Sequence, residues 1–170
     1  MAIAMMFALV GCHQKTTQDD VKKAEAAIFN EDQTVNPEAA TDAVSTFTKY
    51  VEENPDAADA ADYLFKAIEI SINTKQDPKQ SIELVDKLLG NYPKYDKDPV
   101  ALFMLASFVY DEQLGDMDKA RAAYQRIVDD YPDSPFASDA AISITQLGMT
   151  PDELVKMFEN MEKSEDRSQD

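Results

Sequence analysis

The sequence predicts an all-α protein in which about four helix pairs stack into a solenoid. Three observations support this fold class. One pattern of small and apolar residues recurs at offsets of 38 and 39 residues, prolines fall at the ends of the segments that carry it, and strand-like alternation does not persist beyond a few residues. With 170 residues, 44% of them hydrophobic, the chain is long enough for one domain or a short repeat array.

Three segments of the chain share one residue pattern. Each has a small residue, an apolar residue four positions later, another apolar residue three positions beyond, and a proline five positions further on. Spacings of four and three place the first three side chains on one face of a helix, and the proline ends that helix. These repeat-core residues are Ala43, Phe47, Tyr50 and Pro55; Ser81, Val85, Leu88 and Pro93; and Ala120, Tyr124, Ile127 and Pro132.

A fourth segment near the C-terminus carries a shortened version of the pattern. Leu154, Phe158 and Met161 have the same spacing, but no proline closes the segment, which runs into the polar residues 164–170. The last helix of a repeat array is atypical because nothing stacks beyond it. We therefore expect a capping helix that buries these three side chains, followed by a disordered acidic tail over residues 164–170.

Prolines and glycines mark the helix boundaries. Five prolines follow a residue suited to a helix N-cap, in Asn36-Pro37, Asp77-Pro78, Asp98-Pro99, Ser134-Pro135 and Thr150-Pro151. Gly115 and Gly148 are typical of residues that end a helix inside a pair. The pattern predicts eight helices, over residues 19–30, 37–54, 57–73, 78–92, 99–113, 117–131, 135–147 and 151–163.

The first twelve residues predict an export signal with a lipid-attachment site. Residues 1–11 are uncharged and mostly apolar, too short to span a bilayer but typical of the apolar part of a secretory signal. The sequence Leu9-Val10-Gly11-Cys12 resembles the bacterial lipobox, which implies cleavage between Gly11 and Cys12 and lipid attachment to the Cys12 sulfur. No basic residue precedes Lys15, so we expect the signal to start upstream of Met1.

These features predict four consecutive segments. Residues 1–11 are the signal peptide, residues 12–18 a lipidated tether, residues 19–163 the helical array and residues 164–170 the tail. Cys12 is the only cysteine, so the processed chain has no free thiol, as suits an extracytoplasmic compartment. The alternative interpretation of the first residues is a buried helix with a chance cysteine.

Composition argues against several classes of function. The formal net charge of −17 repels phosphate backbones and anionic headgroups, so we expect no nucleic-acid partner and only hydrophobic or covalent membrane attachment. The sequence has no His-Glu-x-x-His or Cys-x-x-Cys motif and no glycine-rich phosphate loop. We therefore expect no metal, no cofactor and no catalytic residue. A hydrolytic enzyme would need a convergent carboxylate pair, and nothing singles one out.

The segment LGDMDKARAAYQRIVDDYP resembles a tetratricopeptide repeat in its Leu-Gly-Asp turn and in its alanine, aromatic, aliphatic and proline positions. The matching residues are Leu114, Gly115, Asp116, Ala120, Tyr124, Ile127 and Pro132. The resemblance implies a right-handed solenoid of about four tetratricopeptide-like helix pairs, which binds an extended peptide along a concave surface lined by the first helix of each pair. On this resemblance the candidate groove residues are Tyr63, Lys66, Ile70 and Phe103.

The segment DDYPDSPFASDA, from Asp129 to Ala140, is similar to the extended repeats of envelope lipoproteins. These include the β-barrel assembly lipoprotein of the BamD type and the coordinator protein of the Tol-Pal system. The resemblance implies an adaptor that binds another envelope protein in bacterial envelope assembly or maintenance. His13 stands where lipoproteins retained in the inner membrane of enteric bacteria carry aspartate, so we expect an outer-membrane protein facing the periplasm. The alternative function is an accessory subunit that binds a small solute or a glycan in the concave groove.

Overall fold

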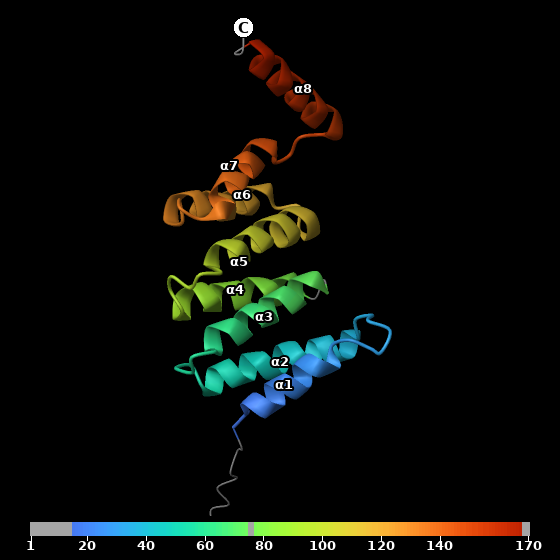
Figure 1. The fold of residues 1–170 in the computed structure, drawn as a ribbon, viewed down its shortest axis with the longest axis vertical. Coiled ribbons are helices and arrows are strands. Elements are labelled where there is room, and N and C mark those ends of the chain that lie inside the picture. Colours follow the sequence, from blue (N-terminus) through green and yellow to red (C-terminus); the bar gives the residue numbers. More distant parts are fainter. Residues whose placement is uncertain (1–14, 75–76, 168–170) are drawn as a thin grey trace, which may run out of the picture.

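The computed structural model describes residues 15–74 and 77–167, and this part of the chain is almost entirely helical (Figure 1). The elements in chain order are α1 (Gln18–Ala27), α2 (Pro37–Glu53), α3 (Ala60–Asn73), α4 (Pro78–Asn91), α5 (Asp98–Met104), the π-helix η1 (Leu105–Gln113), α6 (Met117–Asp130), α7 (Pro135–Gln146) and α8 (Pro151–Arg167). The predicted all-α class is confirmed. Gly11 and Cys12 lie outside the described residues, so cleavage and lipidation stay predictions.

Helix starts follow the predicted capping chemistry at four of the five proline positions. The side chains of Asn36, Asp77, Ser134 and Thr150 each accept a hydrogen bond of 3.0–3.3 Å from a backbone N–H in the first turn of α2, α4, α7 and α8. These bonds satisfy N–H groups that have no partner inside the helix. Gly115 has a φ of +62°, which favours glycine and ends the preceding helix as predicted.

The prediction that Asp98 is the N-cap of its helix is wrong. Helix α5 begins at Asp98 itself, and no side chain caps it. The Asp98 carboxyl is fully buried, its Oδ2 accepts a 3.2 Å hydrogen bond from the Tyr131 hydroxyl, and its Oδ1 has no partner among the described residues. Burial raises the pKa of Asp98. Asp98 therefore connects the start of α5 to the end of α6.

The helices form a stack of pairs. Helix α1 packs against α2, α3 against α4, and α5–η1 against α6, while each pair also packs against the next. Helix α7 then covers α6 and α5. The stack follows the long axis of the molecule from α1 to α7 (Figure 1). The architecture is thus the solenoid of helix pairs that the repeat pattern predicts.

The repeated residues form the interior of this stack. Prolines Pro55, Pro93 and Pro132 are exposed at helix ends, where they stop the helices instead of filling the core. The helical members of the pattern are all buried: Ala43, Phe47, Tyr50, Ser81, Val85, Leu88, Ala120, Tyr124 and Ile127. Apart from Ser81 and Ala120, they contribute to two adjoining hydrophobic cores, one around α1–α4 and one around α5, α6 and α7.

The helix between these two cores changes its geometry halfway along. From Leu105 onward it is a π-helix, and at its end the Leu114 N–H donates to the Val109 C=O, five residues back, at 3.0 Å. The sequence predicts a single α-helix here. Residues Leu105 and Val109 belong to the first core, whereas Leu102 and Ala106 belong to the second. The apolar composition of this segment therefore reflects burial on two sides.

Two predicted boundaries move by three residues. Helix α1 ends at Ala27 because the chain then turns back, and the Asn36 N–H donates to the Ile28 C=O at 2.8 Å. Helix α3 begins at Ala60 because the residues before it form a turn, in which the Ala60 N–H donates to the Ala57 C=O at 3.0 Å. Both shifts shorten helices without changing which face is buried.

The predicted tether is partly docked on the array. The Lys15 ammonium donates to the Glu53 C=O at 3.0 Å, and the Thr16 N–H donates to Glu53 Oε2 at 2.5 Å. Thr17 then caps α1, and its side chain exchanges hydrogen bonds with Asp20. Of the predicted tether over residues 12–18, the part from Lys15 onward therefore contacts the array or belongs to α1.

The C-terminal helix α8 departs from its predicted role as a capping helix. It extends beyond α7 at the end of the stack (Figure 1). Leu154 is half-buried, but Phe158 is 52% exposed, so the predicted burial of Phe158 is wrong. The side chain of Met161 lies outside the part that the structure describes. Helix α8 also continues to Arg167, so the start of the predicted disordered tail is helical.

Candidate functional site

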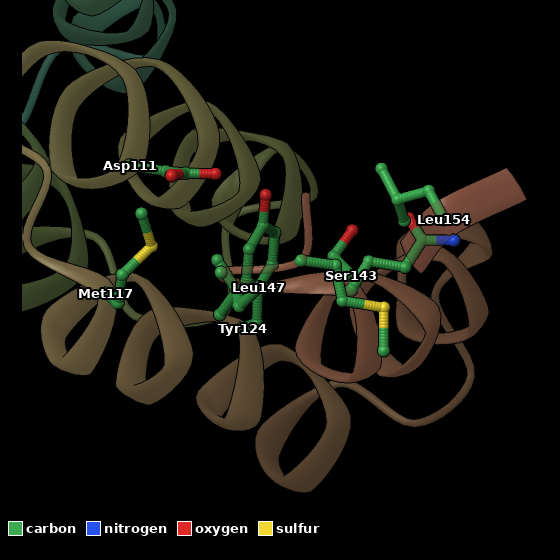
Figure 2. Close-up of a pocket in the computed structure, with 9 residues that line it drawn as sticks. Asp111, Met117, Tyr124, Ser143, Leu147 and Leu154 are labelled. Atoms are coloured by element: carbon green, nitrogen blue, oxygen red, sulfur yellow. The ribbon is translucent and has the colours of Figure 1, made fainter. Parts of the chain in front are cut away.

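A cavity of about 510 Å³ lies at the C-terminal end of the stack (Figure 2). Its walls come from η1, α6, α7, the turn after α7 and the first turn of α8. A volume of this size falls within the range of roughly 300–1,000 Å³ that is typical of ligand sites. The lining residues are Asp111, Met117, Tyr124, Ser143, Gln146, Leu147, Gly148, Met149 and Leu154.

The turn between α7 and α8 shapes one wall of the cavity. Gly148 has a φ of +81°, a left-handed conformation that glycine adopts without a steric penalty, so α7 ends there. Two residues later Thr150 and Glu153 form a reciprocal cap, in which the Thr150 N–H donates to Glu153 Oε2 at 2.8 Å. The turn therefore directs α8 away from α7 and leaves Met149 and Leu154 at the cavity wall.

Asp111 supplies the charge of the cavity. Among the described residues that line the cavity it is the one charged side chain, and it is half-buried. Its carboxylate makes no hydrogen bond or ion pair with another described residue. In Figure 2 this carboxylate and the Tyr124 hydroxyl lie toward the same side of the cavity. The site thus offers an uncompensated negative charge beside a polar hydroxyl.

Tyr124 belongs to both the core and the cavity. Its side chain is 3% exposed, and this burial raises the pKa of its phenol. The hydroxyls of Ser143 and Ser107 lower that pKa by less, and the negative charge of Asp111 raises it further. The phenol therefore stays protonated at neutral pH, where its hydroxyl can accept as well as donate a hydrogen bond.

Exposed apolar side chains gather in the same part of the chain. Among the described residues, nine large hydrophobic side chains are strongly exposed, and only Phe29 and Val35 of these lie in the N-terminal half. Exposed apolar surface marks an interaction site where it is contiguous, and Met117 and Met149 of this set both line the cavity. The seven in the C-terminal half are Phe108, Leu114, Met117, Ile142, Met149, Val155 and Phe158.

The candidate groove residues on α3 do not form an open binding surface. Tyr63 is 8% exposed, and its ring packs against Phe47 and Tyr50 with centroid distances of 5.4 and 5.3 Å. The Lys66 ammonium forms an ion pair with Glu25 on α1 at 2.7 Å. Tyr63 therefore belongs to the core and Lys66 joins two helices, so the prediction that Tyr63 lines a groove is wrong.

The remaining two candidate groove residues also pack against the cores. Ile70 is half-buried against the first core. Phe103 is half-buried in the second core, with its ring 5.2 Å from Tyr124 and 5.7 Å from Phe136. A solute- or glycan-binding groove would need exposed aromatic rings at these positions. The site that the structure offers lies instead at the end of the array.

Comparison with known families supports the repeat interpretation. Residues 100–134 match the tetratricopeptide repeat family. The similarity to this family is shown for this one segment. The match covers α5, η1 and α6, and it includes the Leu114–Pro132 segment in which the sequence shows the clearest resemblance. Curated proteins and solved structures give no significant match.

The matched repeat forms one side of the cavity. It contributes Asp111, Met117 and Tyr124, while the opposite wall comes from α7 and the start of α8, outside the match. Tetratricopeptide repeats are typically interaction scaffolds without catalytic activity. The described residues contain no group of His, Cys, Asp or Glu side chains that could hold a metal ion. Nor does this part of the chain contain a helix long and apolar enough to cross a membrane.

Sequence reasoning missed most of the cavity residues. Tyr124 was predicted as a repeat-core residue and Gly148 as a helix end, but neither pattern predicts a cavity. Asp111 and Ser143 sit in helices without any local motif, so only the three-dimensional packing brings them together. The absence of a closing proline after Met161 is the one sequence signal that separates this end of the array from the others.

Proposed function

We propose that the protein is a lipid-anchored adaptor of the bacterial cell envelope, whose helical array binds a segment of another envelope protein. The observation that carries the binding function is the C-terminal end of the array, where a partly polar cavity adjoins exposed apolar side chains. Tetratricopeptide arrays use surfaces between stacked helices to hold partner segments. Because α8 extends beyond the stack and does not cover α7, such a surface stays available at this end of the array.

The anchoring half of the proposal rests on the lipobox-like sequence that ends at Cys12. Cleavage after Gly11 would free the amino group of Cys12, and its sulfur would carry a diacylglyceryl group. One acyl chain holds a protein only marginally, at about 0.8 kcal/mol per buried methylene, whereas two or three chains hold it stably. His13 follows the cysteine where aspartate would favour retention in the inner membrane, which supports the outer membrane.

The docked N-terminal residues determine how far the array would stand from the membrane. A tether that stayed free as far as Gln18 would reach about 20 Å, at ~3.4 Å per residue. Because Lys15 and Thr16 are bound to Glu53, only His13 and Gln14 separate Cys12 from the docked chain, so the three residue steps from Cys12 to Lys15 reach about 10 Å. Helices α1 and α2 would then lie next to the membrane, and the cavity at the opposite end of the stack would face the periplasm (Figure 1).

Site-specific photo-crosslinking in the native host tests both halves of the proposal. A photoreactive amino acid at Met149, on the cavity rim, is compared with the same amino acid at Ala26, an exposed position on α1. We expect an envelope protein to crosslink at Met149 and not at Ala26. We also expect mass spectrometry to find acyl groups on Cys12 of the wild-type protein.

Two results would contradict this function. Equal crosslinking at Met149 and Ala26, or none at Met149, would remove the cavity as the binding site. An unmodified Cys12 with residues 1–11 still attached would remove the membrane anchor. A Cys12→Ala variant serves as the control for anchoring, since it should lose the acyl mass while keeping the helical fold.

A further inference from the structure

We propose that the cavity binds a lysine or arginine side chain of the partner segment, with Asp111 as its counter-charge. The inference rests on the proposed binding of a protein partner and specifies the chemistry of that partner. Three properties of the cavity carry it: the unpaired carboxylate, the apolar walls and the sign of the surrounding charge.

Asp111 lacks the kind of partner that several acidic side chains of the array have. Asp116 forms an ion pair with Lys119 at 3.0 Å, and Glu52 forms one with Lys87 at 2.6 Å. Asp111 is half-buried, yet no described residue supplies a donor or a positive charge to its carboxylate. A carboxylate that is partly withdrawn from water gains most from a charged donor, because such hydrogen bonds are about twice as strong as neutral ones.

The remaining walls fit the rest of a basic side chain. Met117, Leu147 and Leu154 offer apolar surface, and lysine and arginine side chains bury their methylene stems along such surface while the charged head finds polar partners. The hydroxyls of Tyr124 and Ser143 can accept hydrogen bonds from an ammonium or guanidinium group. The cavity therefore combines an apolar wall with acceptors at one side.

The net charge of the protein favours the same partner. A formal charge of −17 attracts basic segments and accelerates their association, and it repels a second copy of this chain. An acidic or neutral segment would leave Asp111 unpaired and partly desolvated in the complex, which costs binding free energy. Of the possible occupants, a segment with lysine or arginine is the one whose charge matches both the cavity and its surroundings.

A pair of peptides that differ in one charge tests this proposal. The probe is acetyl-Gly-Ala-Leu-Lys-Leu-Ala-Gly-amide, and its partner has norleucine in place of lysine. Calorimetric titration uses the full-length protein in detergent, as wild type, as Asp111→Asn and as Asp139→Asn. Asp139 is exposed on α7 and does not line the cavity, so its substitution removes the same charge elsewhere.

We expect wild type and Asp139→Asn to bind the lysine peptide about tenfold more tightly than the norleucine peptide. In Asp111→Asn this difference should disappear. Equal binding of the two peptides by the wild type, no binding of the lysine peptide, or equal losses in both variants would overturn the inference. Equal losses would mean that only the overall charge attracts the peptide.

The crosslinking experiment separates this inference from the proposed function. If the envelope partner still crosslinks at Met149 when Asp111 is replaced by Asn, at the wild-type yield, the inference is wrong and the adaptor function stands. If no partner crosslinks at Met149 in either background, the adaptor function itself is wrong. The expected result is crosslinking in the wild type and a yield at least fivefold lower in the variant.

Discussion

The two ends of the helical stack contain the same repeat pattern but use it differently. In the N-terminal half, α2, α3 and α4 lie between neighbouring helices, and the pairs are joined by polar contacts such as Lys66–Glu25 at 2.7 Å and Lys87–Glu52 at 2.6 Å. In the C-terminal half, α8 leaves the stack, the cavity opens and apolar side chains reach the surface. Helices with the same pattern therefore stabilise the stack where a neighbouring helix covers them, and they leave a binding surface where no helix covers them.

This difference assigns stability to one end and recognition to the other. A solenoid is held together by contacts between adjacent repeats, so a repeat with a neighbour on only one side contributes less to stability. Val155 and Phe158 on α8 are 57% and 52% exposed, so they bury little apolar surface and add little to the free energy of folding. Substitutions at the two ends should therefore differ sharply in their effect on unfolding.

The largest expected difference lies between two phenylalanines at equivalent repeat positions. Phe47 is fully buried in α2, whereas Phe158 is 52% exposed in α8. We expect Phe47→Ala to lower the free energy of unfolding by about 3–5 kcal/mol, and Phe158→Ala to change it by about 0.5 kcal/mol or less. Urea unfolding followed by circular dichroism measures both. Similar losses in the two variants would show that α8 is packed like the other helices.

A smaller effect is expected at a buried polar contact of the N-terminal half. The hydroxyls of Ser71 and Ser81 lie 2.8 Å apart and are fully buried, and Ser81 stands where the other repeats have Ala43 and Ala120. Replacing Ser71 by alanine should cost about 1–3 kcal/mol, because the Ser81 hydroxyl loses its partner. The double alanine variant should be more stable than Ser71→Ala in the same urea titration. A double variant that is less stable would mean that the two residues act independently.

The repeat pattern predicted the buried face of α2, α4 and α6 because that face depends mainly on local spacing. Ala120, Tyr124 and Ile127 are buried as the pattern predicts, and four of the five predicted capping residues begin their helices where expected. The pattern cannot say which neighbour covers a face. Tyr63 was therefore predicted in a groove although it packs in the core, and Phe158 in a core although it is exposed.

The cavity depends on features with no sequence signature. Asp111 lies in the π-helical part of the helix from Leu105 onward, and this part of the helix lies between two cores. The direction of α8 follows from the turn at Gly148 together with the absence of a covering neighbour. A sequence pattern predicts the turn itself, but not the space that the turn leaves beside Tyr124.

Asp98, at the junction between the two halves, predicts a pH-dependent contribution to stability. Burial raises its pKa in the folded state, so the folded protein binds a proton more tightly than the unfolded chain. Its contribution to stability is therefore greatest at low pH and is lost as the pH rises through the folded-state pKa. Asp98→Asn should make the protein about 1 kcal/mol more stable than wild type at pH 7, since no charge is then buried.

The comparison must be made at two pH values to isolate this group. Near pH 3.5, where Asp98 is largely protonated in both states, the difference between Asp98→Asn and wild type should nearly vanish. Asp96→Asn, at an exposed position two residues earlier, is the control and should show no such pH dependence. A variant that is less stable than wild type at pH 7 would mean that the charged form of Asp98 holds the junction together.

The smallest expected effects compare one glycine from each half. Gly90 lies in α4, and an added Cβ meets no atom within 4 Å, so Gly90→Ala should raise the free energy of unfolding by about 0.5–1 kcal/mol. Gly148 also has room for a Cβ, but its φ of +81° strains any L-residue. Because α8 packs little against the other described helices, a change in its direction can relieve this strain. Gly148→Ala should therefore speed hydrogen exchange in the first turn of α8 without lowering global stability by more than about 0.5 kcal/mol. A global loss as large as that of a buried residue would show that the turn at Gly148 holds the whole array, and the division between a rigid half and a binding end would then fail.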